Sequence, residues 1–326
     1  MDGARDFYKT MRELSDSEWQ ERIEEIAETE GYFEPLGEDH FAMFADEGAV
    51  LLVTFETRES IRRLRENQLP LGASVARANG WSSLTLVCNR ATWFRDPRVF
   101  AYFDRLVDDA FFEDFDKVVF YGSGPCGYAA AAFSVAAPGA TVLAMSPQAT
   151  LDPKLAGWDD RFRQMRRTSF EDRYGFAPDM MEGVGEGYIL FDPFEPLDAM
   201  HAALFARPGV TLLPCRNMGN QIEDIFAFTQ LLEPLLCDAV NGAFTEKGFW
   251  KMYRERRNSP RYLRRLGYAL QDRGRTVLEA ILCRNVVERL KGPRFLQRFE
   301  RLETHLKDQG ITLPPPRAAQ RAQRVG

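Results

Sequence analysis

The stretch at residues 121–127 combines small residues with two side chains that could act as nucleophiles. It reads YGSGPCG and follows an apolar, β-branched run at residues 117–121. Such a turn lets a strand pass abruptly into a helix, because only small residues fit at its tight positions. In acyl-transfer enzymes built this way, a nucleophile stands in the turn and nearby amides bind the oxyanion. The stretch therefore indicates acyl-transfer chemistry or a degenerate form of such a site.

Cys126 and Ser123 are the candidate nucleophiles of this turn. A thiol at a helix N-terminus has a depressed pKa, which favours Cys126. The frame that makes Cys126 central, however, places Tyr128 where a glycine is needed. Ser123 has Tyr121 instead of glycine two residues before it. An active hydrolase or acyl transferase that uses Cys126 or Ser123 is therefore one hypothesis, although both lie in an imperfect frame.

The same stretch also matches a nucleotide-binding pattern. Gly122, Gly124 and Gly127 spell G-x-G-x-x-G between a predicted strand and a predicted helix, where backbone amides can cradle an anion. The pattern also needs an acid about 20 residues later, at the end of the next strand. That strand ends in MSPQ at residues 145–148, which contains no acid. A nucleotide-binding protein using residues 122–127 is therefore an alternative hypothesis.

The elements around the turn alternate between short apolar runs and helix-length segments. A capping pattern predicts a helix at residues 16–29, and two runs at residues 40–44 and 49–55 predict a hairpin. The later strand-like runs are residues 84–88, 117–121, 140–144, 188–191 and 210–213. Further helices are predicted at residues 97–112 and 221–240. The pattern predicts an α/β fold with a doubly wound, mostly parallel sheet covered on both faces.

We expect four parts along the chain. Residues 1–40 form an N-terminal helical segment, and residues 41–241 form the α/β domain. Residues 151–187 are too long for a simple crossover and predict an excursion over the carboxyl edge of the sheet. Residues 242–312 predict a C-terminal α-helical extension, and residues 313–326 predict a disordered tail. The extension contains predicted basic helices at residues 260–272, 275–290 and 294–307.

Several motifs occur in a recognisable order around the turn. They are Thr92-Trp93-Phe94, Gly122-Ser123, Gly127-Tyr128-Ala129-Ala130, Met145-Ser146-Pro147-Gln148, and Phe191-Asp192-Pro193 with Asp198 and His201. Over about residues 49–236, the chain resembles the α/β-hydrolase-like proteins of cell-surface polysaccharide and accessory-secretion systems. That group typically reads GSSMGGYAA at the turn. The resemblance implies an α/β-hydrolase-like fold and a link to cell-surface polysaccharide.

The resemblance also implies where a catalytic triad would lie. The nucleophile position falls on Gly124, the acid on Asp192, and the base, in the loop after the last strand, on Asn220. Glycine has no nucleophile, and asparagine cannot take a proton near neutral pH. The main hypothesis is therefore a catalytically degenerate α/β-hydrolase-like protein that binds a ligand or partner. Its predicted ligand-binding residues are Gly122, Gly124, Gly127 and Asn220.

The composition argues against several other classes of protein. The 326 residues are 45% hydrophobic, and no apolar run is long enough to cross a bilayer, so we expect a cytoplasmic protein without a membrane span. Five scattered cysteines suggest neither disulfides nor a metal site. Asp198 and His201 could form a metal pair on a helix, but no third ligand is evident. We expect no metal and no cofactor, and a structural role for His40.

The charge of the chain is unevenly distributed. Residues 251–326 contain 19 Lys and Arg against 7 Asp and Glu. That net +12 leaves −18 for the preceding 250 residues, since the whole chain has −6. A basic module of this kind predicts an interaction surface. No helix-turn-helix, zinc or aromatic RNA-binding signature accompanies it, so the expected partner is an unidentified small molecule or protein, and nucleic acid is unlikely.

Overall fold

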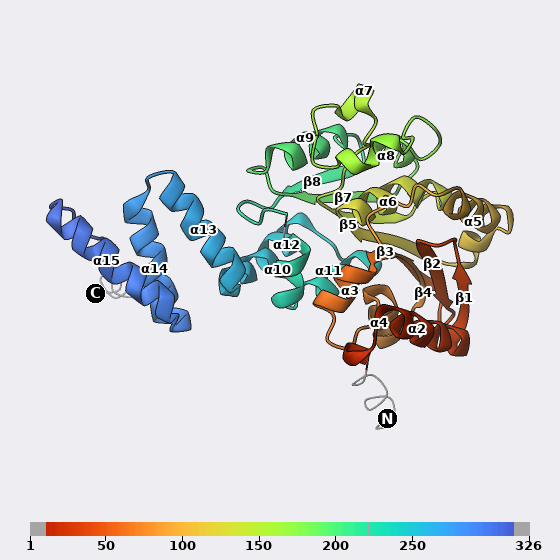
Figure 1. Ribbon diagram of the computed structural model, residues 1–326, viewed down its shortest axis with the longest axis horizontal. Helices are drawn as coiled ribbons and strands as arrows, with labels where there is room; N and C mark the ends of the chain where they lie inside the picture. The colour runs from red at the N-terminus through yellow and green to blue at the C-terminus, as the bar shows by residue number, and fades with distance from the viewer. Residues whose placement is uncertain (1–10, 221, 316–326) are drawn as a thin grey trace. The chain divides into compact units, whose positions relative to one another are not determined.

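The computed structural model describes residues 11–220 and 222–315, and within them an eight-stranded sheet organises the first part of the chain (Figure 1). The strands are β1 (Gly31–Pro35), β2 (His40–Ala45), β3 (Val50–Thr57), β4 (Ser82–Cys88), β5 (Lys117–Ser123), β6 (Thr141–Met145), β7 (Glu186–Phe191) and β8 (Val210–Pro214). Their order is β1-β2-β4-β3-β5-β6-β7-β8. Strands β3 to β8 run parallel, whereas β1 and β2 are antiparallel to their neighbours. The chain has the predicted α/β-hydrolase-like fold with a helical C-terminal extension.

The predicted hairpin between residues 40–44 and 49–55 is wrong. Strand β2 pairs with β1 and β4, whereas β3 pairs with β4 and β5. The turn between β2 and β3 is held by the start of β4, because the Ser82 hydroxyl accepts hydrogen bonds from the amides of Glu47 and Gly48 at 3.0 Å each. Local spacing could not reveal that a strand from later in the chain lies between the two runs.

The predicted first helix is confirmed as α2 (Asp16–Glu30). The Ser15 hydroxyl accepts a hydrogen bond from the Glu18 amide, and the Glu18 carboxylate accepts one from the Ser15 amide at 2.7 Å. This reciprocal arrangement satisfies amides that the first turn of a helix leaves unpaired. The segment before residue 40 is nevertheless not wholly helical, because β1 starts directly after α2.

Helices cover both faces of the sheet (Figure 1). One face packs against α5 (Pro97–Asp108) and α6 (Pro125–Phe133), and the other packs against α2, α3 (Arg58–Leu64) and α4 (Leu71–Asn79). The helix α11 (Leu232–Val240) lies against β5 and β6. This double cover explains why the central strands are apolar along their whole length.

Two predicted helices are shorter than expected. The helix predicted at residues 97–112 ends as α5, and a separate turn η2 (Phe111–Asp114) follows Ala110, whose φ is 55°. The helix predicted at residues 221–240 is divided into α10 (Ile222–Phe228) and α11. Gln230 separates them with a φ of 55°, and residue 221 lies outside the described residues. A positive φ cannot continue a right-handed helix, so each helix stops there.

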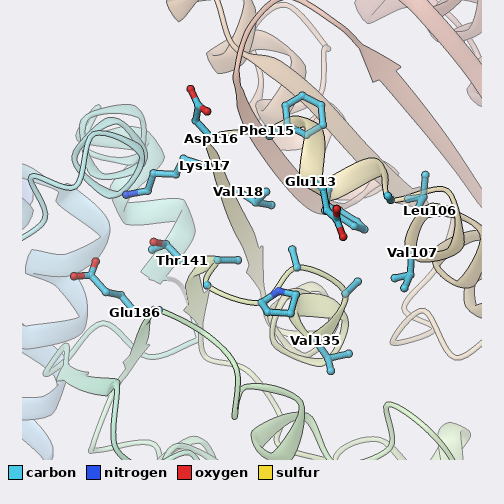
Figure 2. A pocket seen from close by; sticks show the side chains of 18 of the residues that line it. Leu106, Val107, Glu113, Phe115, Asp116, Lys117, Val118, Val135, Thr141 and Glu186 are labelled. Carbon is cyan, nitrogen blue, oxygen red and sulfur yellow. The ribbon is translucent and has the colours of Figure 1, made fainter.

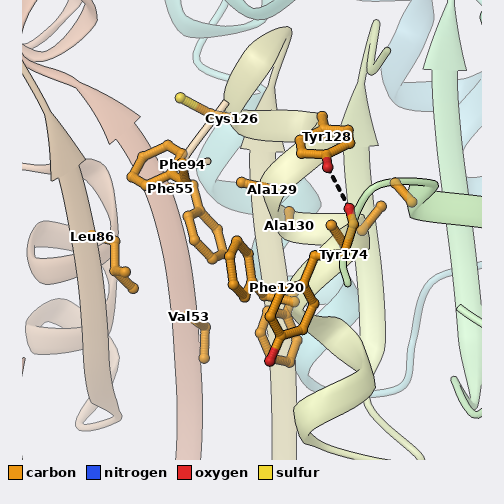
Figure 3. Close-up of a cluster of buried hydrophobic side chains, with 14 of the residues drawn as sticks. Val53, Phe55, Leu86, Phe94, Phe120, Cys126, Tyr128, Ala129, Ala130 and Tyr174 are labelled. Carbon is orange, nitrogen blue, oxygen red and sulfur yellow. Dashed lines mark hydrogen bonds between the residues drawn. The ribbon is translucent and has the colours of Figure 1, made fainter. Parts of the chain in front are cut away.

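The core beneath α6 packs aromatic rings against small side chains (Figure 3). The ring centroid of Phe133 lies 5.6 Å from that of Phe55 and 4.4 Å from that of Phe103. Residues 129–132 are four buried alanines, which let the helix lie close to the sheet. Burying each such ring contributes about 1.5–3 kcal/mol to folding. The core therefore holds α6, and with it the turn that precedes α6, in a defined position.

A long excursion connects β6 to β7 and corresponds to the one predicted at residues 151–187. It contains α7 (Pro153–Ala156), η4 (Arg163–Arg167) and α8 (Ala177–Met180). Phe170 and Tyr174 of the excursion belong to the same core as α6. The Tyr128 hydroxyl of α6 donates a hydrogen bond to the Tyr174 carbonyl oxygen. The excursion therefore packs against the helix that follows the turn.

A buried polar network fastens the excursion to α9 (Pro196–Leu204). His201 Nε2 lies 3.0 Å from Asp159 Oδ2, and its Nδ1 accepts a backbone amide of the excursion at 3.1 Å. Arg161 bridges Asp159 at 2.7 Å and Asp198 at 2.6 Å. Burial lowers the pKa of His201. The suspected pair Asp198 and His201 is thus engaged by protein groups, and the part of the chain with described placement holds no cluster of three or more potential metal ligands.

The chain divides into two compact units, one ending at Tyr253 and the other beginning at Arg254, whereas the predicted border followed residue 241. The helix α12 (Glu246–Met252) belongs to the first unit, and η5 (Tyr253–Asn258) spans the division. The second unit confirms the three predicted basic helices as α13 (Pro260–Asp272), α14 (Thr276–Leu290) and α15 (Pro293–Asp308). Most of the predicted tail, residues 316–326, lies outside the described residues. Among the described helices, none has both the length and the apolar character needed to cross a membrane.

Candidate functional site at the turn after strand β5

The turn predicted at residues 121–127 links β5 directly to α6. Gly124 has φ 59° and ψ −123°, a backbone conformation that residues with a side chain rarely adopt. Its amide donates to the Met145 carbonyl oxygen at 2.7 Å, and its own carbonyl accepts from the Tyr128 amide at 3.0 Å. A Cβ placed on Gly124 would meet nothing within 4 Å. Space alone therefore does not require glycine at this position.

Gly122, in contrast, is required by close packing. A Cβ at this position would lie 2.1 Å from the Cys126 carbonyl oxygen and 2.8 Å from the Gly127 amide nitrogen. Any side chain on Gly122 would displace the first turn of α6. The backbone of this turn packs as closely as a strand-to-helix turn in an α/β-hydrolase requires, although Gly124 brings no reactive group to it.

Pro125 is a feature of the turn that the sequence analysis missed. It follows Gly124 and occupies the first turn of α6, where proline is well tolerated. In α/β-hydrolases, the amide of the residue after the nucleophile is one of the donors of the oxyanion hole. Proline has no amide hydrogen, so this donor is absent from the turn. The signal was present in the sequence, directly after the nucleophile position.

Cys126 lies at the start of α6 and is 3% exposed. The pKa of Cys126 lies well above its ordinary value. It is raised by a hydrogen bond with the Cys88 thiol, by burial, and by the nearby Glu223 and Glu56 carboxylates. The shift is opposite to the depression expected at a helix N-terminus. Cys126 is therefore a protonated thiol at neutral pH, and its role as a nucleophile stays a prediction.

Ser123 is the last residue of β5 and is half-buried. It lies opposite Met145 in the pairing of β5 with β6. Within residues 11–220 and 222–315, no histidine or carboxylate forms a hydrogen bond with its hydroxyl. A serine needs such a base to become a nucleophile. Its catalytic role, like that of Cys126, stays a prediction.

Asp192 stands at the predicted acid position, directly after β7, and is fully buried. Its Oδ1 accepts the Phe194 amide at 2.9 Å, and its Oδ2 accepts the Gly219 amide at 2.7 Å. Gly219 precedes Asn220, which is exposed in the loop after β8. The carboxylate therefore tethers the loop that carries the predicted base position, instead of holding a histidine side chain.

Two further carboxylates lie close to the turn, and the sequence analysis did not single them out. Glu56, in β3, accepts the Leu71 and Gly72 amides at 2.8 and 2.9 Å and so caps α4. Glu223, in α10, accepts the Tyr121 hydroxyl at 3.0 Å. Burial raises the pKa of Glu223. The sequence signal available for Glu56 was an acid inside the apolar run of β3. The sequence carries no such signal for Glu223, because its hydrogen bond with Tyr121 joins elements that are far apart along the chain.

His40 does not supply the missing base through any described contact. Its Nε2 lies 2.6 Å from Thr92 Oγ1, and its ring packs against Phe94 with centroids 5.4 Å apart. Burial lowers the pKa of His40. Among the residues of defined placement, His40 forms no hydrogen bond, ion pair or ring contact with residues 122–127. Next to Thr92, the Trp93 indole donates to Gln148 Oε1 at 3.0 Å, which joins two of the motifs noted in the sequence.

A separate hollow of about 800 Å³ lies at the other end of the strands (Figure 2). Its lining includes Lys117, Thr141 and Glu186, which begin β5, β6 and β7. The turn after β5 lies at the opposite, carboxyl edge of the same parallel strands. In open α/β sheets, ligands bind at the carboxyl ends of the strands. The hollow is therefore not part of the candidate site.

The chain is distantly similar to several solved structures. No protein-family model matches the chain, and no curated protein sequence matches it. An esterase of Pyrobaculum calidifontis is similar in structure, with a TM-score of 0.41 and 12% identity over 72% of this chain and 95% of the esterase. A capsule O-acetyltransferase of Neisseria meningitidis serogroup A has a TM-score of 0.39 and 13% identity over 62% and 91% of the two chains. Carboxyl esterase 2 of Tuber melanosporum has a TM-score of 0.38 and 12% identity over 63% and 80%. Similarity at these TM-scores and identities identifies neither a family nor a function.

Proposed function

We infer that this chain is a catalytically degenerate α/β-hydrolase-like protein that binds a ligand or partner at the turn after β5. The observation that carries the proposal is the combination of Gly124 and Pro125 in a turn of retained geometry. Gly124 brings no nucleophile, and Pro125 brings no amide hydrogen for an oxyanion. Asn220 adds no general base, since an amide does not accept a proton near neutral pH.

The proposed binding surface consists of the turn and the loop after β8. The space in front of Gly124 is open, and Asn220 is exposed in a loop tethered by Asp192. Asparagine offers both hydrogen-bond donors and an acceptor. Gly122 and Gly127 keep the helix start close to this surface. A link of the ligand to cell-surface polysaccharide, implied by the sequence resemblance, is part of this proposal.

An active hydrolase or acyl transferase is the second candidate. Its specific support is that the strained turn persists and that Asp192 stands after β7, where a triad acid belongs. Ser123 or Cys126 would be its nucleophile. The raised pKa of Cys126 weighs against the thiolate, whereas Ser123 lacks a described base.

An esterase and labelling experiment separates these two candidates. The full chain is incubated with p-nitrophenyl acetate and, separately, with a fluorophosphonate and with iodoacetamide. The binding proposal predicts no turnover above buffer and no stoichiometric labelling of Ser123 or Cys126 in the folded protein. Turnover that is lost in Cys126→Ala or Ser123→Ala, with an unchanged melting temperature, would establish the enzyme instead.

A third candidate, nucleotide binding at residues 122–127, is tested in the same preparation. An adenine nucleotide that binds the folded chain must raise its melting temperature. The fingerprint also needs an acid at the end of the next strand to bind the ribose, and residues 145–148 contain none. We therefore expect no shift at millimolar ATP or NAD.

A further inference from the structure

The second compact unit has a hollow of about 630 Å³ along one side of α13. The residues that α13 contributes to its wall are Pro260, Arg264, Gly267, Tyr268 and Gln271. Their spacing of three and four residues places them on one face of the helix over three turns. At 1.5 Å per residue, that wall is about 16 Å long. The hollow is thus an elongated groove parallel to a helix, which we call the α13 groove.

The floor and far wall of the α13 groove are apolar in part. Cys283 of α14 and Phe295 of α15 line it, and Tyr268 on the near wall is 65% exposed. A helix face that presents an exposed tyrosine beside an apolar floor normally packs against another helix. Within the described part of this unit, α14 and α15 pack together through Ala280, Leu302 and neighbouring residues, and no further helix covers the groove.

Glycines make the α13 groove accessible to a helix backbone. Gly267 faces the groove, and a Cβ there would meet only the Leu282 Cδ2 atom, at 3.9 Å. Gly292 opens the far wall at the start of α15. Small residues at such positions let two helices approach closely. A helix bound in this groove would be the fourth helix of a bundle with α13, α14 and α15.

The charge of the α13 groove selects an acidic occupant. Arg264 and Arg294 lie on opposite walls, both exposed, and neither forms an ion pair within the described residues. The one acid of the lining, Glu279, is buried and bound to Arg298 at 2.7 Å. The groove therefore presents unpaired positive charge above an apolar floor. The chain's own residues 316–326 hold three arginines and no acid, so they have the wrong sign to occupy it.

We propose that the α13 groove docks an acidic amphipathic helix of a partner protein. Apolar residues on one face of that helix contact Tyr268 and Phe295, while its flanking Asp or Glu residues pair with Arg264 and Arg294. This is the helix-in-groove mode of peptide recognition, in which apolar anchors repeat every three or four residues. A nucleic-acid backbone would pair with the arginines but would leave the apolar floor unfilled. The proposal is independent of the function inferred for the turn after β5.

The test measures binding of a fluorescein-labelled peptide to the full chain by fluorescence anisotropy. The peptide is a helix of about four turns, roughly 15 residues, with leucine along one face and glutamate along the other. Its control carries lysine in place of every glutamate. We expect saturable binding of the acidic peptide alone. Binding weakens when salt rises from about 0.1 to about 0.5 M, because salt screens exposed charges.

Three variants separate shape from charge. Gly267→Leu fills the α13 groove without changing its charge, and leucine favours a helix more than glycine does. The double variant Arg264→Glu with Arg294→Glu reverses the rim. We expect each to weaken binding at least tenfold, whereas Arg275→Glu, outside the groove lining, leaves it within twofold. Circular dichroism and melting curves confirm that each variant remains folded.

Several results would overturn the proposal. They are an absence of acidic-peptide binding at millimolar peptide, equal binding of the lysine control, or an unchanged affinity in Gly267→Leu. Tighter binding of a 20-nucleotide single-stranded DNA than of the peptide would assign the surface to nucleic acid. Self-association of the chain that Gly267→Leu abolishes would identify a second copy as the occupant.

Discussion

Alanine at Gly122 and at Gly124 gives a matched test of the turn, because the two positions are neighbours with opposite requirements. At Gly122 the new Cβ would lie 2.1 Å from the Cys126 carbonyl oxygen, so the start of α6 must move. Overpacking of this kind costs about 3 kcal/mol. One kcal/mol lowers the melting temperature of a unit of this size by about 2–4 °C, so we expect Gly122→Ala to lose about 6–12 °C.

At Gly124 the new Cβ enters open space, and only the backbone conformation is strained. A residue with a side chain at such a φ and ψ costs about 1–2 kcal/mol. We therefore expect Gly124→Ala to lose about 2–8 °C and to keep the far-ultraviolet circular dichroism of the parent. Differential scanning calorimetry of the two variants and the parent measures the contrast. Equal losses, or a smaller loss for Gly122→Ala, would refute the close approach of backbone atoms in the turn.

The remaining predictions concern chemistry and pH. The double variant Gly124→Ser with Asn220→His should hydrolyse p-nitrophenyl acetate only slowly. Adding Pro125→Ala restores an amide hydrogen after the nucleophile position and should raise kcat by about 10²–10³, the usual contribution of one oxyanion donor. Equal rates for the double and triple variants would refute a role of this amide in binding the oxyanion. Iodoacetamide at pH 7 should label Cys126 far more slowly in the folded than in the urea-unfolded protein, because the hydrogen bond with Cys88 and burial both raise the pKa of the thiol. Mass spectrometry of the peptide that contains Cys126 measures both rates, and equal rates would contradict its burial. Burial lowers the pKa of His201, so its stabilising contribution is complete above its unfolded pKa of about 6.5 and is lost as the pH falls below that value. Urea unfolding at pH 7.5 and 5.5 should therefore show a smaller pH dependence in His201→Gln than in the parent.

Elements with local causes were predictable from the sequence. The capping pattern at residues 15–18 predicted the start of α2, and the three basic helices of the second unit lie within a few residues of their predicted bounds. The hairpin failed because pairing of β2 with β4 depends on a strand that comes later in the chain. The helix breaks at Ala110 and Gln230 were not predicted, because apolar periodicity does not reveal which residue adopts a positive φ.

The candidate site also combines features that the sequence predicts with features that depend on long-range contacts. Gly124, Asp192 and Asn220 could be placed by order along the chain, because an α/β-hydrolase-like sheet assigns each triad position to the end of one particular strand. Two contacts of the site could not be predicted from the sequence. They are the hydrogen bond from the Tyr121 hydroxyl to the Glu223 carboxylate and the hydrogen bond between the Cys126 and Cys88 thiols. Burial and these contacts, which reverse the expected shift of the Cys126 pKa, arise only when distant segments meet.

The sequence by itself determined the turn after β5, since glycine and proline act through their own backbone geometry wherever they stand. That is why the sequence alone shows that Gly124 has no reactive side chain and that Pro125 has no amide hydrogen. Only the tertiary structure decided that Asp192 holds a backbone loop, that His40 contacts Thr92, and that α13 borders an open groove. These are long-range contacts, and their physical cause is the packing of elements whose positions no local pattern specifies.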